Sequence, residues 1–304
     1  MKLTKNVFTT EIDGWDTYCK IFHSISVWEP LVNFILEKEN LPVSEIENLT
    51  PGSNAVFKSG NYVVKIFAPK EFGFYGDAED KTEKFSLNFA QSRGVPVSKL
   101  VAHGEVKDKY DFFYMILEYI NGTELWQVSE KLSDNEKFDI ARRLREITDL
   151  MNIPCEDFNG IDIIHDEDRH KRWANYPERF RNERLEYIKS RDFGEKVFIH
   201  GDLCDDNIII DNKGEVYIID FADAVLAPIC YEHAHIACYT FNFDKSYLRG
   251  YFGDYKADEL ADICFNGMLI HAYGGDILTE MNTVKLSEEI SLSDLRKILY
   301  DKIK

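Results

Sequence analysis

Residues 197–224 constrain the fold of this chain more than any other stretch. They read VFIHGDLCDDNIIIDNKGEVYIIDFADA, in which two runs rich in β-branched residues, 208–211 and 215–220, flank an Asn-Lys-Gly turn. Two such runs around an Asn/Gly turn predict a β-hairpin. Because a hairpin brings its open ends together, we expect Asn207, which precedes the first strand, and Asp220, which ends the second, to lie at one edge.

Three oxygen-bearing side chains should meet at that edge, because Asp202 lies in the loop that leads into the first strand. Carboxylate and amide oxygens suit a hard cation such as Mg²⁺, which uses one or two protein carboxylates together with substrate phosphates. In kinase-type phosphoryl transfer, one Asp orients the acceptor hydroxyl and takes its proton, while an Asn and a second Asp hold the metal. We therefore predict Asp202 as the catalytic base and Asn207 and Asp220 as Mg²⁺ ligands. The alternative is a buried His-Gly-Asp turn before an ordinary hairpin.

The stretch resembles the aminoglycoside phosphotransferases and their relatives, the choline, homoserine, fructosamine and hygromycin-type kinases. The shared pattern is His-Gly-Asp, four residues, Asn, a hairpin and Ile-Asp-Phe, and this chain has it at 200–202, Asn207 and 219–221. The resemblance implies an α+β, bilobed, protein-kinase-like fold with nucleotide in the cleft. A small antiparallel sheet lobe with one helix is expected over residues 1–119, and a larger, mainly helical lobe over 120–304.

The resemblance also implies a nucleotide-binding lysine. Residues 46–67 predict a three-strand meander, and Lys65 lies in its third run. In the family the equivalent lysine contacts the α- and β-phosphates of ATP or GTP, whereas the alternative is an outward-facing strand Lys. Glu83, on a helix expected over 82–90, is the candidate partner that holds Lys65 in place, and Glu79 is the rival.

Two further segments complete the predicted nucleotide site. Ser53 and Asn54 lie in a small, polar turn that can bring N–H groups and a hydroxyl near phosphates, although a hairpin loop without ligand is the commoner meaning. The resemblance places the purine against backbone groups near Glu118 and Ile120. Backbone contacts of this kind do not distinguish ATP from GTP.

The formal net charge of −18 bears on the partners of the protein. Such a field repels nucleic acid and anionic membranes, whose binding depends on clustered Lys and Arg, and it attracts cations. Solubility alone is an equally good explanation of the charge. Beside the kinase motif, the charge favours a cationic, amine-bearing acceptor.

We therefore expect an aminoglycoside as the acceptor. The alternatives are another metabolite (choline, an amino sugar or homoserine) and a nucleotide-binding regulator without turnover. Asp205, Asp223 and Glu232 are the candidate carboxylates for a cationic substrate. Glu232 stands where many relatives have an Asp. This departure leaves the identity of the substrate undecided, but it does not affect the predicted fold.

The remaining features indicate an ordinary globular protein. No apolar run is long enough to span a membrane, and no apolar segment follows the basic N-terminus as in a secretion signal. None of the six cysteines forms a Cys-x-x-Cys pair, so we expect reduced thiols in a cytoplasmic protein. His233 and His235 should fall on different faces of a helix, which argues against zinc.

Helix signals occur on both sides of the central motif. Residues 27–39 predict a helix with Pro30 in its first turn, and residues 69–81 predict a loop. Capping patterns open two further helices near Ser133 and Ser291.

Overall fold

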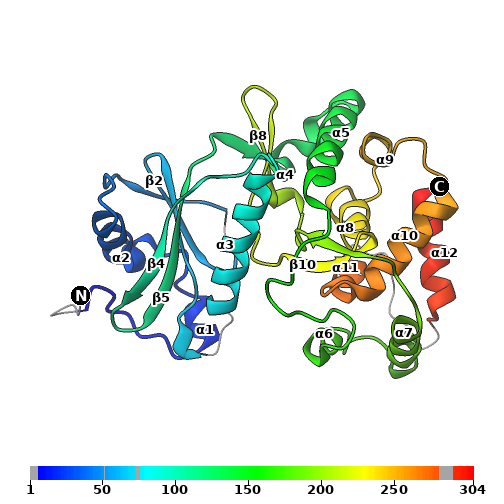
Figure 1. Cartoon of the computed structure of the whole chain (residues 1–304), viewed down its shortest axis with the longest axis horizontal. Helices are drawn as coiled ribbons and strands as arrows, with labels where there is room; N and C mark the ends of the chain where they lie inside the picture. The colour runs from blue at the N-terminus through cyan, green and yellow to red at the C-terminus, as the bar shows by residue number, and fades with distance from the viewer. Residues whose placement is uncertain (1–5, 51, 73–75, 281–289) are drawn as a thin grey trace. The chain divides into compact units, whose positions relative to one another are not determined.

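The computed structural model describes residues 6–50, 52–72, 76–280 and 290–304. The chain divides into two compact units, and Figure 1 labels many of their elements. The first unit comprises residues 1–91 and 97–121, and the second comprises 92–96 and 122–304. The main division thus falls beside the boundary expected at residues 119 and 120.

The first unit is built on a five-stranded antiparallel sheet in the order β1-β2-β3-β5-β4. Its strands are β1 (Ile46–Asn48), β2 (Ala55–Ser59), β3 (Tyr62–Ile66), β4 (Leu100–Lys107) and β5 (Asp111–Glu118). The meander expected over residues 46–67 is confirmed as β1 to β3. A two-residue turn joins β2 to β3, and Gly60 begins it at φ +60°, a conformation that a hairpin turn requires and glycine adopts at little cost.

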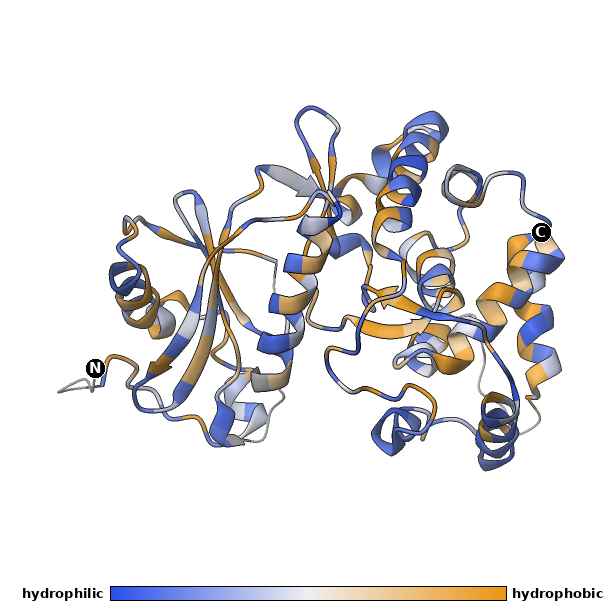
Figure 2. Ribbon diagram, in the orientation of Figure 1, coloured by the Kyte–Doolittle hydropathy of each residue, from blue (hydrophilic) through white to orange (hydrophobic). Residues whose placement is uncertain are grey.

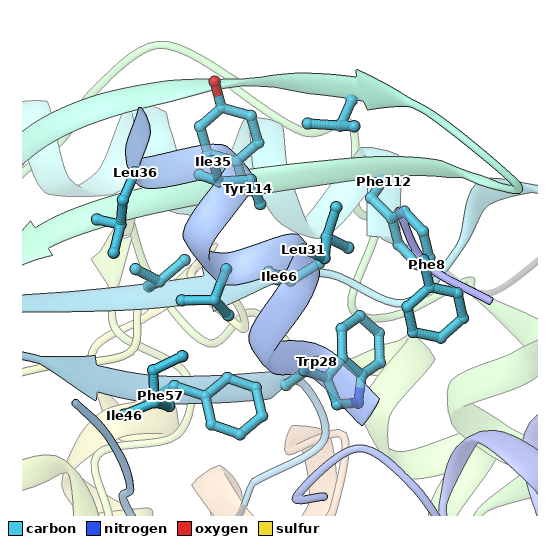
Figure 3. Packing of buried hydrophobic residues seen from close by; sticks show 14 of the residues in the cluster. Phe8, Trp28, Leu31, Ile35, Leu36, Ile46, Phe57, Ile66, Phe112 and Tyr114 are labelled. Carbon is cyan, nitrogen blue, oxygen red and sulfur yellow. The ribbon is translucent and has the colours of Figure 1, made fainter. Parts of the chain in front are cut away.

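Helix α2 (Ile25–Lys38) covers one face of this sheet (Figure 3). Trp28, Leu31 and Ile35 of the helix belong to one buried cluster with residues of β2, β3 and β5, namely Phe57, Ile66, Phe112 and Tyr114. The helix predicted over residues 27–39 is present as α2, whereas the short α1 (Trp15–Tyr18) was not predicted. With α3, the lobe therefore holds more than the one helix that the family resemblance implies. Pro30 is the sixth residue of α2 rather than part of its first turn, because the helix already begins after Ser24.

Helix α3 (Gly76–Ser92) contacts the opposite face of the sheet through the side chain of Lys65. Side chains alternate along a strand, so Lys65 points away from the cluster that contains its neighbours in β3, and it contacts α3 instead. The helix begins well before residue 82, and the segment expected as a loop over 69–81 holds its start and the short helix η1 (Lys70–Phe72). The prediction was wrong here because the first turns of α3 are acidic and polar. Acidic and polar residues are favourable at a helix N-terminus, but they lack the helical spacing of apolar residues by which a helix is predicted from sequence.

The second unit contains two small antiparallel sheets. One has the order β6-β8-β9, with β6 (Gly122–Glu124), β8 (Ile208–Asp211) and β9 (Val216–Ile218). The pairing of β8 with β9 confirms the predicted hairpin, and β6 is a third strand that the sequence did not reveal. The other sheet pairs β7 (Lys196–Ile199) with β10 (Val225–Pro228).

Helices make up most of the second unit. They are α4 (Leu125–Val128), η2 (Ser129–Lys131), α5 (Asp134–Met151), α6 (Glu167–Lys171), α7 (Glu178–Ser190), η3 (Asp205–Asn207), α8 (Cys230–His235), the π-helix η4 (Ile236–Thr240), α9 (Lys245–Phe252), α10 (Ala257–Ile270), α11 (Gly274–Glu280) and α12 (Leu292–Ile303). Capping boxes at Ser133 and Ser291 open α5 and α12, as predicted.

Hydropathy follows burial in both units. Figure 2 shows hydrophobic residues on the strands of the first unit and on α10, whereas α5 and α7 are largely hydrophilic. Within the described part of the chain, no helix has the length and apolar character needed to cross a membrane.

Candidate active site

The predicted base, Asp202, lies on a tight turn directly after β7. Gly201 has φ +89°, and a Cβ atom built there would lie 2.0 Å from the backbone oxygen of Asp223. Glycine is therefore required at this position for two reasons, the left-handed backbone and the close approach of the segment after β9. This packing fixes the backbone from which the side chain of Asp202 projects.

The side chain of Asp202 is 38% exposed, and among the described residues each of its carboxylate oxygens has one polar side-chain contact. Oδ1 lies 3.5 Å from Nε2 of His235, and Oδ2 lies 3.5 Å from Nδ2 of Asn207. Burial alone would raise the pKa of Asp202, but the contact with His235 outweighs it and holds this pKa below its usual value. Asp202 is therefore ionised at neutral pH and can accept a proton.

Asn207 and Asp220 lie at the open end of the β8–β9 hairpin, where the sequence placed them. The carbonyl of Asn207 accepts the N–H of Ile219 at 3.0 Å, so Asp220 is next to the paired residue. Nδ2 of Asn207 donates to the carbonyl of Asp202 at 2.8 Å, which leaves the amide oxygen available for a cation. Asp220 has φ +60°, a left-handed conformation that is uncommon for non-glycine residues and recurs at functional sites. One amide oxygen and one carboxylate form a donor set that fits Mg²⁺.

Glu232 takes a different part from the one expected. We predicted that it contacts a cationic substrate, but its side chain is completely buried in α8. Oε1 accepts the N–H of His200 at 3.2 Å, and Oε2 accepts the N–H of Gly201 at 3.3 Å. The carboxylate therefore holds the backbone of the turn that carries Asp202. Sequence position could not reveal this, because burial of Glu232 depends on how α8 packs against that turn.

Asp205 and Asp223, the other predicted substrate carboxylates, lie near Asp202. Asp205 is half-buried in η3, and burial raises its pKa. Asp223 is exposed, and it acts together with Asp202 to raise the pKa of the nearby Tyr273, for which burial is the larger cause. Asp206 is a further exposed carboxylate, which we had not singled out; burial and the charge of Asp205 raise its pKa. These carboxylates thus add negative charge in the neighbourhood of the proposed base.

In the first unit the structure pairs Lys65 with Glu83. Nζ of Lys65 lies 2.7 Å from Oε2 of Glu83, and the two side chains are 5% and 1% exposed. The pairing predicted between these residues is confirmed. The rival, Glu79, instead accepts a hydrogen bond from Nδ2 of Asn54 at 3.4 Å.

The side chain of Asn54 has a structural part in the turn before β2, and the predicted approach of backbone N–H groups and the Ser53 hydroxyl to phosphates stays a prediction. Asn54 is 5% exposed, and its Oδ1 accepts the N–H of Ala68 at 3.3 Å while its Nδ2 contacts Glu79. Its side chain therefore ties the turn to the end of β3 and to α3, and this engagement argues against a side-chain contact to phosphate. Ser53 is exposed beside it.

The segment after β5 was expected to contact the purine through its backbone. The N–H of Glu118 donates to the carbonyl of Lys99 at 2.9 Å, and its own carbonyl accepts the hydroxyl of Ser98, so only a second carbonyl lone pair is left there. Ile120 follows the end of the strand, and its backbone N–H has no hydrogen-bond partner among the residues that the structure describes. Of the two residues, Ile120 therefore has the better backbone donor for a ligand.

Comparisons with known proteins bear on this site. The family model described as "Phosphotransferase enzyme family" matches residues 52–263, which is more than two thirds of the chain and includes Lys65 and the whole stretch from Asp202 to Asp220. No curated protein sequence matches the chain.

Solved structures share the fold at low identity. A GDP complex of an aminoglycoside 2'-phosphotransferase has a TM-score of 0.59 at 16% identity, covering 90% of this chain and 96% of its own. The choline kinase LicA from Streptococcus pneumoniae has a TM-score of 0.57 at 17% identity, and the match covers 89% of this chain and 98% of LicA. An ethanolamine kinase from Plasmodium vivax has a TM-score of 0.53 at 13% identity, and the match covers 94% of this chain and 91% of the kinase. These similarities confirm the predicted α+β, protein-kinase-like fold class.

Proposed function

Because the chain belongs to the phosphotransferase enzyme family, we propose that it transfers the γ-phosphoryl group of ATP or GTP to a hydroxyl of a small, cationic, amine-bearing acceptor. Membership of this family confirms the resemblance drawn from the sequence and the prediction of a phosphotransferase. The observation that carries the proposal is an ionised Asp202 beside Asn207 and Asp220 at the open end of a hairpin.

In this reaction Asp202 orients the acceptor hydroxyl and takes its proton. The hydroxyl oxygen forms a bond to the γ-phosphorus while the bond from that phosphorus to the β–γ bridging oxygen breaks, and the nucleoside diphosphate leaves. The low pKa of Asp202 keeps it ionised, so it is ready to accept a hydrogen bond from the substrate. Such catalysis consists largely of positioning and charge stabilisation.

Asn207 and Asp220 would hold Mg²⁺ through the amide oxygen and the carboxylate. When bound, the cation neutralises phosphate charge that develops during transfer. Lys65 would contact the phosphates as a compact cation, and its pairing with Glu83 fixes its position.

The acceptor is proposed to be cationic because carboxylates gather near the base. Asp205, Asp206 and Asp223 add negative charge near Asp202, and the whole chain carries −18. An aminoglycoside is the first candidate, since similar folds were solved with kanamycin and with hygromycin B. Choline or ethanolamine is the second, since kinases of both have the same fold.

The test is a screen of nucleotide consumption with the full chain and Mg²⁺. ATP and GTP are each offered with kanamycin, hygromycin B, choline and ethanolamine, and the product is checked by mass spectrometry for one added phosphate. We expect consumption that requires one of these amines and ceases when EDTA removes the metal. Nucleotide consumption that none of these amines stimulates would contradict the proposal.

A further inference from the structure

Two buried histidines, His200 and His271, use both ring nitrogens on backbone groups around the base. His200 accepts the N–H of Asp202 at 3.3 Å and donates to the carbonyl of Ile219 at 3.0 Å. His271 accepts the N–H of Tyr273 at 3.1 Å and donates, at 3.2 Å, to the carbonyl of the residue before Asp202. A nitrogen that accepts an N–H carries no proton, so both rings are neutral with the proton on Nε2. Burial lowers the pKa of both, in agreement with that state.

His235 differs from these two, because its polar contact is with the base itself. Its Nε2 lies 3.5 Å from Oδ1 of Asp202, and its side chain is 2% exposed. Its Nδ1 is buried without a hydrogen-bond partner among the described residues. The carboxylate of Asp202 is thus the polar group that Nε2 approaches, and a proton on Nε2 would lie toward it. Stacking on His271, with centroids 4.9 Å apart and planes at 23°, holds the ring in that orientation.

The backbone that presents His235 is unusual. His235 is the last residue of α8, and the π-helix η4 (Ile236–Thr240) follows it directly. Side chains on both sides of His235 bind the catalytic turn: Glu232 accepts two of its N–H groups, and Thr240 donates to the carbonyl of Leu203 at 2.6 Å. A π segment replaces the regular α-helical hydrogen bonds with bonds between residues five apart, and such segments occur frequently at functional sites. Here it lies in an element that contacts the turn through three side chains.

We propose that His235 is a positioning residue for phosphoryl transfer, donating from Nε2 to Oδ1 of Asp202 so that the carboxylate plane is fixed toward the acceptor hydroxyl. The terminal torsion of an aspartate is broad, so a carboxylate without such a donor samples many planes. Asn207 approaches the other oxygen at 3.5 Å, so the two contacts together define the plane. The inference rests on the proposed phosphotransferase activity, to which it adds the residue that orients the base.

The kinetic test compares three variants. His235→Phe keeps a ring that can stack on His271 but lacks the donor, and we expect kcat to fall about 10- to 100-fold because the base is misplaced. The KM for nucleotide should change less than about threefold, since nucleotide binding is not altered. His235→Gln supplies an N–H and should recover most of the lost kcat. His233→Phe is the matched control, because His233 lies on the same helix but faces the rings of Tyr251 and Phe252.

A spectroscopic test does not depend on turnover. Long-range ¹H–¹⁵N spectra of the histidines should show His235 protonated on Nε2, and Asp202→Ala should shift the His235 signals more than those of His233. A His235→Phe variant with wild-type kcat, or a Gln variant no better than Phe, would overturn the inference while leaving the proposed function intact. If wild-type protein transfers phosphate to no acceptor, the proposed function fails. The spectra then still decide, and a His235 protonated on Nδ1 or indifferent to Asp202→Ala overturns the positioning contact.

Discussion

The functional charged groups of the two units differ in their exposure to solvent. In the first, Lys65 and Glu83 form an ion pair at 2.7 Å that is almost closed to solvent. In the second, Asp202 is 38% exposed, and its side-chain partners are two groups at 3.5 Å, one on His235 and one on Asn207. A buried pair is costly to break because the remaining charge is stranded, whereas a partly hydrated carboxylate remains accessible to a substrate hydroxyl. The first arrangement suits a fixed cation, and the second suits a group that must accept and release a proton.

The largest effect should come from Asp202→Ala. Loss of the base should lower acceptor-dependent transfer about 10³-fold, near the middle to upper range for general base catalysis. Thermal unfolding should change little, because the carboxylate is partly hydrated and makes only long contacts. Stopped nucleotide-release assays and thermal melts measure the two quantities. A variant that retains wild-type transfer would show that Asp202 is not the base.

The second prediction concerns the buried pair. Glu83→Ala strands the charge of Lys65 and should cost about 3–5 kcal/mol in the free energy of unfolding. The double replacement Lys65→Met with Glu83→Leu should recover most of that stability but no activity, since apolar residues can replace a buried pair but cannot bind phosphate. Urea unfolding measures each variant.

An exposed pair provides the control for this prediction. Lys58 and Glu47 are also 2.7 Å apart, but the side chain of Glu47 is largely open to solvent. Glu47→Ala should cost less than about 1 kcal/mol. If Glu83→Ala is no worse than Glu47→Ala, the contrast in burial has no energetic consequence.

A smaller effect is expected for Glu232→Gln. The amide keeps one acceptor oxygen but presents a donor to the second backbone N–H of the turn, so the unfolding free energy should fall by about 1–3 kcal/mol. The kcat should fall with it, because the turn carries Asp202. Melts and steady-state kinetics test this. A raised KM for the cationic acceptor with unchanged stability would instead favour the substrate role first expected from sequence.

The smallest effect concerns the pH dependence of stability at Asp205. Burial raises the pKa of its carboxyl in the folded state, so this group lowers stability as the pH rises from its ordinary pKa to the raised one, and the loss is complete above the raised pKa. Asp205→Asn should therefore raise the Tm at pH 7 by about 1–2 °C. The gain should vanish below the ordinary Asp pKa of about 3.9. Differential scanning calorimetry across this range measures it, and a gain that persists at low pH would contradict the assignment.

Local patterns carried much of the prediction. The hairpin, the capping boxes at Ser133 and Ser291, and the placement of Asn207 beside Asp220 depend on residues close in sequence, and the structure contains all of them. The pairing of Lys65 with Glu83 spans two elements, and it was predictable only through the family resemblance.

Burial decided the roles of two polar side chains. Glu232 was expected to contact substrate but is buried and accepts backbone N–H groups, and the side chain of Asn54 is likewise buried and accepts a backbone N–H. His235 was weighed only as a zinc ligand, and its spacing from His233 correctly placed the two on different faces. No pattern in the chain indicated that one of those faces meets Asp202.

The sequence by itself determined the hairpin, its polar end groups and the family of the protein, because these follow from short-range spacing. Only the tertiary structure decided which of the many carboxylates and imidazoles form hydrogen bonds to the protein's own backbone. Glu232 and His200 hold the backbone, whereas Asp202 keeps partial exposure. The reason is physical: burial and hydrogen-bond satisfaction arise from contacts between distant segments, and they set whether a polar group supports the fold or remains open to a substrate.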